Sequence, residues 1–266
     1  MAETSLTEQV LQRDRLLLIA LIGLLFALAG LYTVFGVGMR MTALEMTTMR
    51  DMPEPGIPGI WSPGYALLVF LMWWVMMVAM MLPSVAPTVL LYTVLLRHSG
   101  KTVRVPAIAV AFLAGYLVTW AGFSVIASAA QWALEAAGVV SATRMTLVDT
   151  IPGGLVLIAT GVFQFTPLKA ACLEHCRSPA KFLTERRRAG VTGAFRMGVE
   201  HGSYCLGCCW FLMALLFVGG IMNLYWIVGV AAFVAMEKLT PWGNTLSKVA
   251  GLALSSWGAW IVLRSF

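Results

Sequence analysis

Charged residues are scarce in this chain of 266 residues: Asp, Glu, Lys and Arg together make up 11%, whereas 60% of the residues are hydrophobic. Soluble globular proteins contain roughly 25% charged residues, so the composition excludes a soluble enzyme, a disordered chain and a collagen-like chain. Histidine occurs only three times and no CxxCH motif is present, which excludes covalent c-type haem. No His triad, Ser–His–Asp set or glycine-rich phosphate loop supports a hydrolase or a nucleotide-binding protein.

Long apolar runs dominate what remains, and they predict an all-α, polytopic transmembrane helix bundle with residues 1–266 in a single domain. Runs of about 20 apolar residues are long enough to cross a bilayer as helices. About seven spans are expected, at residues 16–38, 65–84, 106–130, 151–167, 202–220, 224–239 and 246–263. Pro83 and Pro87 lie at the end of the second span, so we expect that helix to kink or break there.

The positions of the cations predict the orientation of these spans. The net charge is +6, and with the N-terminus in the cytoplasm fourteen of the eighteen Lys and Arg residues fall in cytoplasmic segments. Multi-pass membrane proteins carry such an excess of Lys and Arg on the cytoplasmic side. Membrane topology and anionic lipid headgroups therefore explain the basic balance better than nucleic acid does.

A short surface helix is expected between Ser178 and Gly190. Ser178 is a good N-cap, Pro179 suits the first helical position and Gly190 suits the stop. In this hypothesis Phe182 and Leu183 dip into the bilayer while the basic residues of the segment meet the headgroups. The alternative is that the basic residues only set the topology.

All five cysteines and two of the three histidines occur in two short groups on the expected cytoplasmic side. On a helix, each group falls within an arc of about 100°. The first group, after the fourth span, is Cys172, His175 and Cys176; the second, entering the fifth span, is His201, Cys205, Cys208 and Cys209. Thiolate and imidazole together suit copper(I), zinc or an iron–sulfur centre. We therefore predict one metal site between the fourth and fifth spans; a disulfide framework is disfavoured in a reducing compartment.

Glu237, at the end of the sixth span, extends the predicted site. A carboxylate inside a membrane indicates function. Three roles stay open for it: a metal ligand, a partner that supports His201, or the ion-pair partner of Lys238.

A methionine stripe in the second span is a further candidate for metal contact. Met72, Met76 and Met80 recur every fourth residue, and thioethers select copper(I), although methionine also fills apolar cores. With the methionines of the outside connection after the first span, the stripe would form a path for copper across the bilayer.

Four stretches of the chain resemble a known family. They are Trp74–Pro83, Thr166–Pro179, Tyr204–Trp210 and Glu237–Pro241. In combination they are similar to a bacterial family of unknown function, described as predicted metal-binding integral membrane proteins, over about residues 70–243. The resemblance implies a multi-pass protein of the bacterial inner membrane that binds metal, and it carries no established reaction.

Three functions stay open at this point. The favoured one is the handling or transport of a soft metal, with copper preferred and zinc or iron as alternatives. The second is a membrane metalloenzyme or redox subunit that uses Glu237 as a general base. The third is a structural subunit of a membrane complex, in which the metal only pins two helices together. A metallochaperone or other membrane subunits are the expected partners.

The topology can be tested by labelling single cysteines in a variant that lacks the native ones. A cysteine introduced near Arg50 should react with a membrane-impermeant thiol reagent added outside, and one near Arg187 should not, because the positive-inside distribution places them on opposite faces. The opposite labelling would reverse the topology and move the predicted metal site to the other face.

Overall fold

The computed structural model describes residues 6–36, 42–48, 60–98, 105–142 and 145–266. These residues form helices, with no strand among them beyond an isolated bridge between Val140 and Leu147. The all-α prediction is confirmed. The helices are α1 (Leu6–Phe35), α2 (Ala43–Thr48), α3 (Pro63–His98), α4 (Val105–Ala136), α5 (Thr150–Phe163), α6 (Pro167–Arg177), α7 (Pro179–Glu185), α8 (Gly190–Gly219), α9 (Leu224–Leu239) and α10 (Gly243–Arg264).

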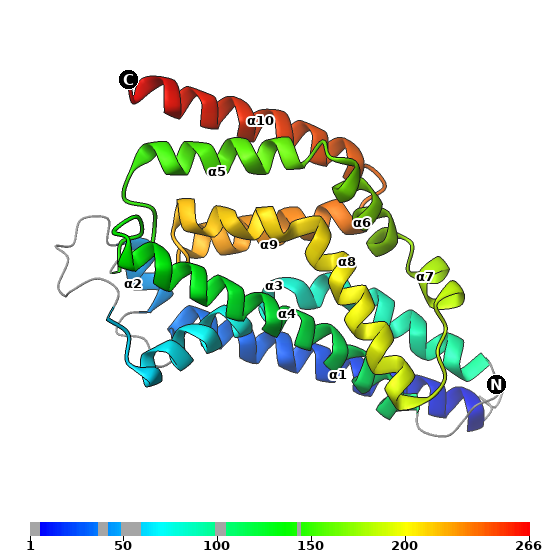
Figure 1. Ribbon diagram of the computed structural model, residues 1–266. Helices are drawn as coiled ribbons and strands as arrows, with labels where there is room; N and C mark the ends of the chain where they lie inside the picture. Colours follow the sequence, from blue (N-terminus) through cyan, green and yellow to red (C-terminus); the bar gives the residue numbers. More distant parts are fainter. Residues whose placement is uncertain (1–5, 37–41, 49–59, 99–104, 143–144) are drawn as a thin grey trace.

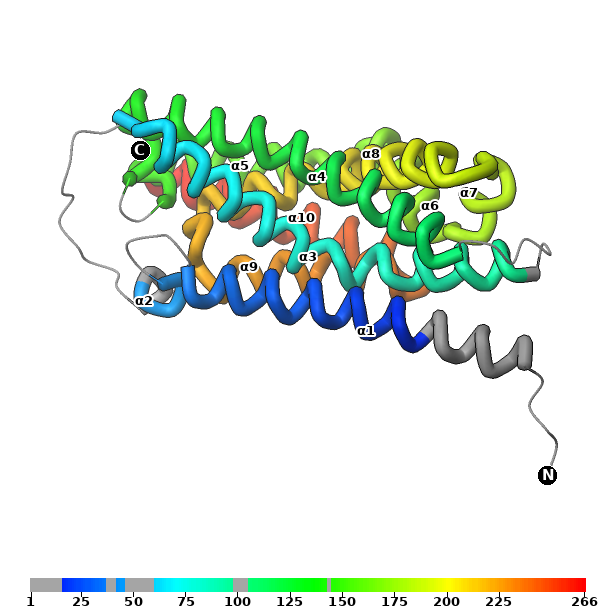
Figure 2. The backbone as a smooth tube through the Cα atoms, turned by 90° about the horizontal axis from the view of Figure 1, so that it is seen from below, coloured from blue at the N-terminus to red at the C-terminus, as the bar shows by residue number. Residues whose placement is uncertain are grey.

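Helix α8 lies at the centre of the bundle. Figure 1 shows α5 and α10 side by side on one side, α1, α3 and α4 on the other, and α8 and α9 between them. Helix α8 packs against α4, α5, α6 and α9. Helices α2 and α7 lie at opposite ends of the bundle, as Figure 2 also shows. The residues of α8 therefore contact most of the elements that build the site described below.

Each of the seven predicted spans contains a helix, but the helices differ in length. Five described helices are long and apolar enough to cross a membrane: α1 (from Leu16), α3, α4, α8 and α10. Helices α5 and α9 have only 14 and 16 residues. Helix α5 passes the same test only together with α6, as a pair bent by 65°. The exact number of spans and the cytoplasmic N-terminus stay predictions, and the methionine-rich connection after α1 lies largely outside the described residues.

Of the kink or break predicted at Pro83 and Pro87, the break is wrong, because α3 continues as a helix through both prolines to His98, and the kink stays a prediction. An internal proline removes a backbone hydrogen bond and costs about 3 kcal/mol or more. The surrounding segment is fully buried at Met81, Leu82 and Val85, and close van der Waals packing of such side chains stabilises helices that associate in a membrane. Packing thus overrides the local signal, and α3 extends far enough to contact α7.

Glycines allow α4 and α8 to cross at close range. A Cβ atom on Gly198 would collide with the backbone carbonyl of Phe112, and one on Gly115 would collide with that of Phe195. Small residues at such crossings let helix backbones approach each other in membrane proteins. The crossing brings the aromatic residues of α4 against the inner face of α8.

The bend between α5 and α6 directs two cysteines towards α8. The Thr166 side chain caps α6 by accepting a hydrogen bond from the backbone N–H of Lys169 at 3.3 Å, and Pro167 occupies the first position of the helix. Proline favours that position because its missing N–H is not needed there. Helix α6 then packs along α8, which places Cys172 and Cys176 beside it.

The predicted surface helix exists as α7, but it ends at Glu185 rather than near Gly190. Ser178 is its N-cap residue and Pro179 its first residue, whereas Gly190, with φ of +77°, begins α8. Phe182 and Leu183 are each only 2% exposed. The prediction that they enter the bilayer is therefore wrong, because α7 packs onto α3 and α6 and buries them inside the protein.

Candidate functional site

The cysteines of the two predicted groups lie together between α6 and α8. The Cys176 thiol is a hydrogen-bonding neighbour of the Cys205 and Cys208 thiols, and Cys209 is a hydrogen-bonding neighbour of the same two residues. The Cys172 sulfur packs directly against the Cα side of Gly207. All five are free cysteines, and the three on α8 are buried.

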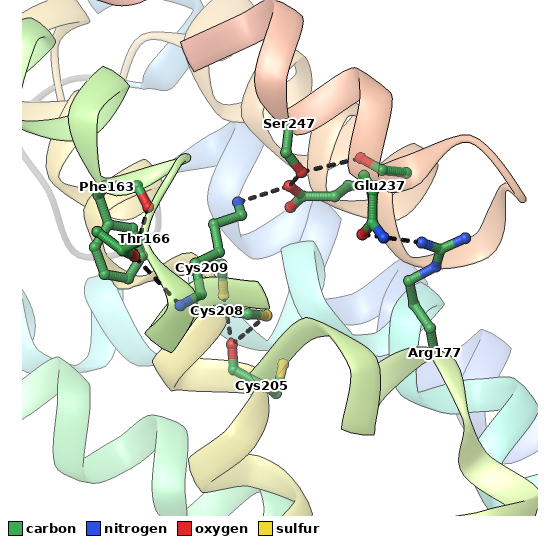
Figure 3. A network of polar contacts seen from close by, with 11 residues as sticks. Phe163, Thr166, Arg177, Cys205, Cys208, Cys209, Glu237 and Ser247 are labelled. Carbon is green, nitrogen blue, oxygen red and sulfur yellow. Dashed lines mark hydrogen bonds and ion pairs between the residues drawn. The ribbon is translucent and has the colours of Figure 1, made fainter. Parts of the chain in front are cut away.

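Two of these thiols are held by the backbone of their own helix. Figure 3 shows Cys208 and Cys209 directed at the backbone carbonyl of Cys205, to which they donate at 3.0 and 2.8 Å. Within the described ranges, no three His, Cys, Asp or Glu side chains are arranged to hold a metal ion. A site with three or more ligands therefore requires these thiols to rotate away from the carbonyl.

A lysine ammonium lies against the cysteine cluster. Lys238, in the last turn of α9, donates a hydrogen bond from Nζ to the Cys205 sulfur at 2.8 Å, and its side chain is 7% exposed. The Tyr116 hydroxyl of α4 lies 3.0 Å from the same sulfur. The Lys238 charge also acts on the other thiols of the cluster, at Cys176, Cys208 and Cys209. A cation beside sulfur stabilises a thiolate, so Cys205 is the sulfur best placed to carry negative charge.

Glu237 forms an ion pair with Lys169 rather than with its neighbour Lys238. The Lys169 Nζ lies 2.6 Å from the Glu237 Oε1, and both side chains are almost completely buried. The Ser247 hydroxyl of α10 donates to the same oxygen, as Figure 3 shows. In the described part of the chain the other oxygen, Oε2, has no hydrogen-bond partner. The metal-ligand role predicted for Glu237 stays a prediction.

Arg177 fixes α6 to the turn between α9 and α10. Its guanidinium donates to the backbone carbonyls of Thr240 and Pro241, both at 2.8 Å, and to the Asn244 side chain at 3.2 Å. The carbonyls at the end of α9 would otherwise lack partners. The contact holds α6, α9 and α10 around the Lys169–Glu237 pair.

The two predicted histidines lie in different surroundings. His175 stacks on Tyr204, with ring centroids 4.2 Å apart, and its Nδ1 pairs with the Ala171 carbonyl at 2.9 Å. His201 is 3% exposed, and its Nδ1 has no hydrogen-bond partner among the described residues. An unpaired buried polar atom costs about 1–3 kcal/mol, so His201 has the ring nitrogen that most needs a ligand.

The methionine stripe is buried, but its burial does not distinguish it from neighbouring methionines. Met72, Met76 and Met80 are 2%, 0% and 3% exposed, and Met77 and Met81 on the same helix are also completely buried. Core packing explains this pattern as well as metal contact does. Metal contact at the stripe stays a prediction.

Three residues of this region were missed or misplaced by sequence reasoning. Lys238 was considered only as a topological charge and as a partner for Glu237, because a lysine at the end of an apolar span commonly extends to the membrane interface. Lys169 was counted only as a topological charge. Tyr116 carries no signal in the sequence, because nothing in the spacing of α4 indicates which helix it faces.

A comparison with protein families relates the chain to copper. The model of the family PpoB2, described as copper chaperone, matches residues 70–261. The chain belongs to this copper chaperone family. No curated protein and no solved structure matches the chain. The matched residues include every cysteine. They also include residues 70–243, the region whose sequence resembles a metal-binding family.

Copper suits the donor atoms that the fold gathers. Thiolates, thioethers and imidazole select copper(I) over hard cations, and the interface of α6 and α8 provides thiols together with His201 one turn away from Cys205. Glu237, as a hard oxygen donor, is instead engaged by Lys169 and Ser247.

The buried ion pair can be tested by removing one charge and then both. Lys169→Met leaves Glu237 without its cation and should lower the free energy of unfolding by about 3–5 kcal/mol. The double variant Lys169→Met/Glu237→Met should recover most of that loss, because apolar residues often replace a buried pair without cost. Thermal unfolding of the metal-free protein in detergent micelles measures both effects.

Copper content of the same double variant tests the role of Glu237. A stable double variant with parental copper content would exclude Glu237 as a ligand, whereas loss of copper with retained stability would establish it as one. Equal instability of the single and double variants would contradict the structural role of the pair.

Proposed function

We propose that this protein is an integral membrane copper(I) carrier of the bacterial inner membrane, which holds the ion between the thiols of α6 and α8 and passes it to a partner protein. One observation supports the site above all others: Cys176 of α6 lies within hydrogen-bonding reach of Cys205 and Cys208 of α8, beside the buried Lys238 ammonium. The copper chaperone family supports the identity of the cargo.

Charge balance favours a monovalent ion at this position. Copper(I) bound by two thiolates has a net charge of −1, which the Lys238 ammonium neutralises. Zinc(II) bound by four thiolates has a net charge of −2 and would leave one negative charge unbalanced. An uncompensated buried charge costs several kcal/mol. The combination of paired thiols with one fixed cation therefore selects copper(I) by charge as well as by softness.

The number of ligands also suits copper(I). Two thiolates are sufficient for this ion, so binding does not require the three-ligand cluster that the described residues lack. Cys176 and Cys205 are the first pair in this proposal because they come from different helices and Cys205 contacts Lys238. Cys172, Cys208, Cys209 and His175 are further donors to which the ion can be exchanged on its way to a metallochaperone or a membrane subunit.

The basic segment around α7 supports an orientation against an anionic surface. Arg186 and Arg188 pair with Glu200 at 3.2 and 3.3 Å and remain about half exposed. Their exposed positive charge suits the anionic headgroups of the cytoplasmic leaflet. In this orientation the cysteine cluster lies nearest the cytoplasmic side, where a soluble metallochaperone can reach it.

Serine substitutions test whether α6 and α8 share one copper site. Cys176→Ser and Cys205→Ser should each lower the copper-to-protein ratio, and the double variant should lose little more than either single variant. Elemental analysis of the purified protein measures the ratio, with Ser203→Ala, on the exposed face of α8, as the control. Additive, half-sized losses would instead show two separate sites, and one tightly bound zinc in the parent would favour the structural function.

Lys238 substitutions test the charge balance. Lys238→Met should weaken copper(I) binding by about 100-fold or more, since removing one partner of a buried pair costs about 3–5 kcal/mol and each tenfold in affinity is about 1.4 kcal/mol. Lys238→Arg keeps the charge and should retain most of the affinity. Competition with a coloured copper(I) chelator measures the affinity, and parental affinity in Lys238→Met would contradict the charge argument.

A further inference from the structure

The inner face of α8 carries a row of soft donor atoms that extends beyond the cysteine cluster. Met197, His201 and Cys205 recur every fourth residue, and Cys208 and Cys209 follow on the same face. Met197 is completely buried and was not among the residues predicted from the sequence. At 1.5 Å per residue the row is about 18 Å long. A thioether, an imidazole and thiols thus follow one another from the α7 end of α8 into the bundle.

His201 is the member of the row whose surroundings indicate a ligand. Its ring lies among Phe112 and Tyr116 of α4 and Phe182 of α7, at centroid distances of 5.9, 6.0 and 5.1 Å. Its Nδ1 is buried without a hydrogen-bond partner in the described structure. A buried ring nitrogen without a partner is destabilising, and in the tautomer that leaves Nδ1 unprotonated its lone pair can bind a soft cation without any new protein contact.

A cavity that adjoins the surface lies close to the first member of the row. The cavity has a volume of about 150 Å³ and lies between α3 and α7, lined by Tyr92, Leu95, Leu96, Leu183, Thr184 and Arg187. Arg187 and Thr184 are exposed, so the cavity adjoins the surface. The Tyr92 hydroxyl lies 3.9 Å from the Met197 sulfur. Tyr92 therefore connects the cavity lining with the thioether, which also accepts a hydrogen bond from the Arg188 backbone N–H at 3.3 Å.

From these observations we infer that Met197 and His201 form an uptake site for a soft monovalent cation, through which copper(I) passes from the cavity beside Tyr92 to the Cys205 thiol. The inference rests on the proposed function. Met197 is the first sulfur along the row, and His201 lies one helical turn from Met197 and one turn from Cys205, about 6 Å along the axis in each direction. A thioether and an imidazole bind copper(I) more weakly than thiolates do, so the order along α8 favours movement towards the cysteines.

The experiment measures the rate of copper uptake separately from its final extent. The metal-free, reduced full-length protein in detergent micelles is mixed with copper(I) bound to a coloured chelator, and the loss of colour is followed by stopped flow. Met197→Leu removes the sulfur and keeps a similar volume. Met213→Leu is the matched control, because Met213 is equally buried on the same helix but lies one turn beyond Cys209, past the thiols at which the inferred uptake route ends.

Met197→Leu should slow copper uptake by about tenfold or more and leave the final copper-to-protein ratio and the equilibrium affinity unchanged, because the thiols remain. Met213→Leu should take up copper at the parental rate. Thermal unfolding of both variants checks that the fold is retained. His201→Gln gives a second measurement, and it should slow uptake in the same way.

Two results would overturn the inference, and they are distinguishable. Parental uptake rates in both Met197→Leu and His201→Gln, with copper still bound at the cysteines, would exclude the uptake site while leaving the proposed function in place. A parent protein that takes up no copper would remove the proposed function and the uptake site together. An equal slowing by Met213→Leu would also contradict the inference, since the effect would then come from altered packing in α8.

Discussion

Two lysine ammonium groups buried in an apolar bundle constrain how α6, α8, α9 and α10 pack. Lys169 and Lys238 are 1% and 7% exposed, and an ion inside a protein costs several kcal/mol unless it has a partner. Lys169 meets Glu237, and Lys238 meets the Cys205 sulfur. These two contacts join α6, α8 and α9, and the Ser247 hydroxyl of α10 donates to the same Glu237 carboxylate, so the need to satisfy these charges fixes four helices around the thiols.

The same arrangement suits a carrier, which has to accept an ion and also release it. In the proposed function, Lys238 neutralises the copper–thiolate complex when the ion is bound and contacts Cys205 when it is not. The buried region is therefore close to charge balance with and without copper. Neither state has a large uncompensated charge that would oppose binding or release of the ion. A site of four thiolates that bound a divalent ion would lack this symmetry.

Helix α8 combines three roles that depend on one another. Its glycines bring it close to α4, which places Phe112 and Tyr116 against His201. Its cysteines face α6, and its first turns lie beside α7, whose Phe182 ring covers His201. The row of donors from Met197 to Cys209 is buried because the neighbouring helices enclose this face, and in the inferred uptake route copper enters through the cavity beside the short α7.

Much of the site could be predicted because helical periodicity determines which residues share a face of one helix. The grouping of Cys172 with Cys176, and of Cys205 with Cys208, follows from spacing alone and agrees with the contacts between α6 and α8. The family match agrees with the expectation of a copper-related protein. Local sequence signals could not show that α3 continues through Pro83, since its packing offsets the lost hydrogen bond, and they misplaced Phe182 because α7 packs onto protein.

The sequence by itself determined the helical composition, the apolar length of the main helices and the faces that carry sulfur and imidazole. These properties depend on residues close to one another along the chain. Only the tertiary structure decided that Lys238 contacts Cys205, that Glu237 pairs with Lys169, and that Tyr92 of α3 reaches Met197 of α8. Those partners lie far apart in the sequence, and their meeting depends on helix crossings set by side-chain shape and close glycine contacts, which no periodicity along a single helix encodes.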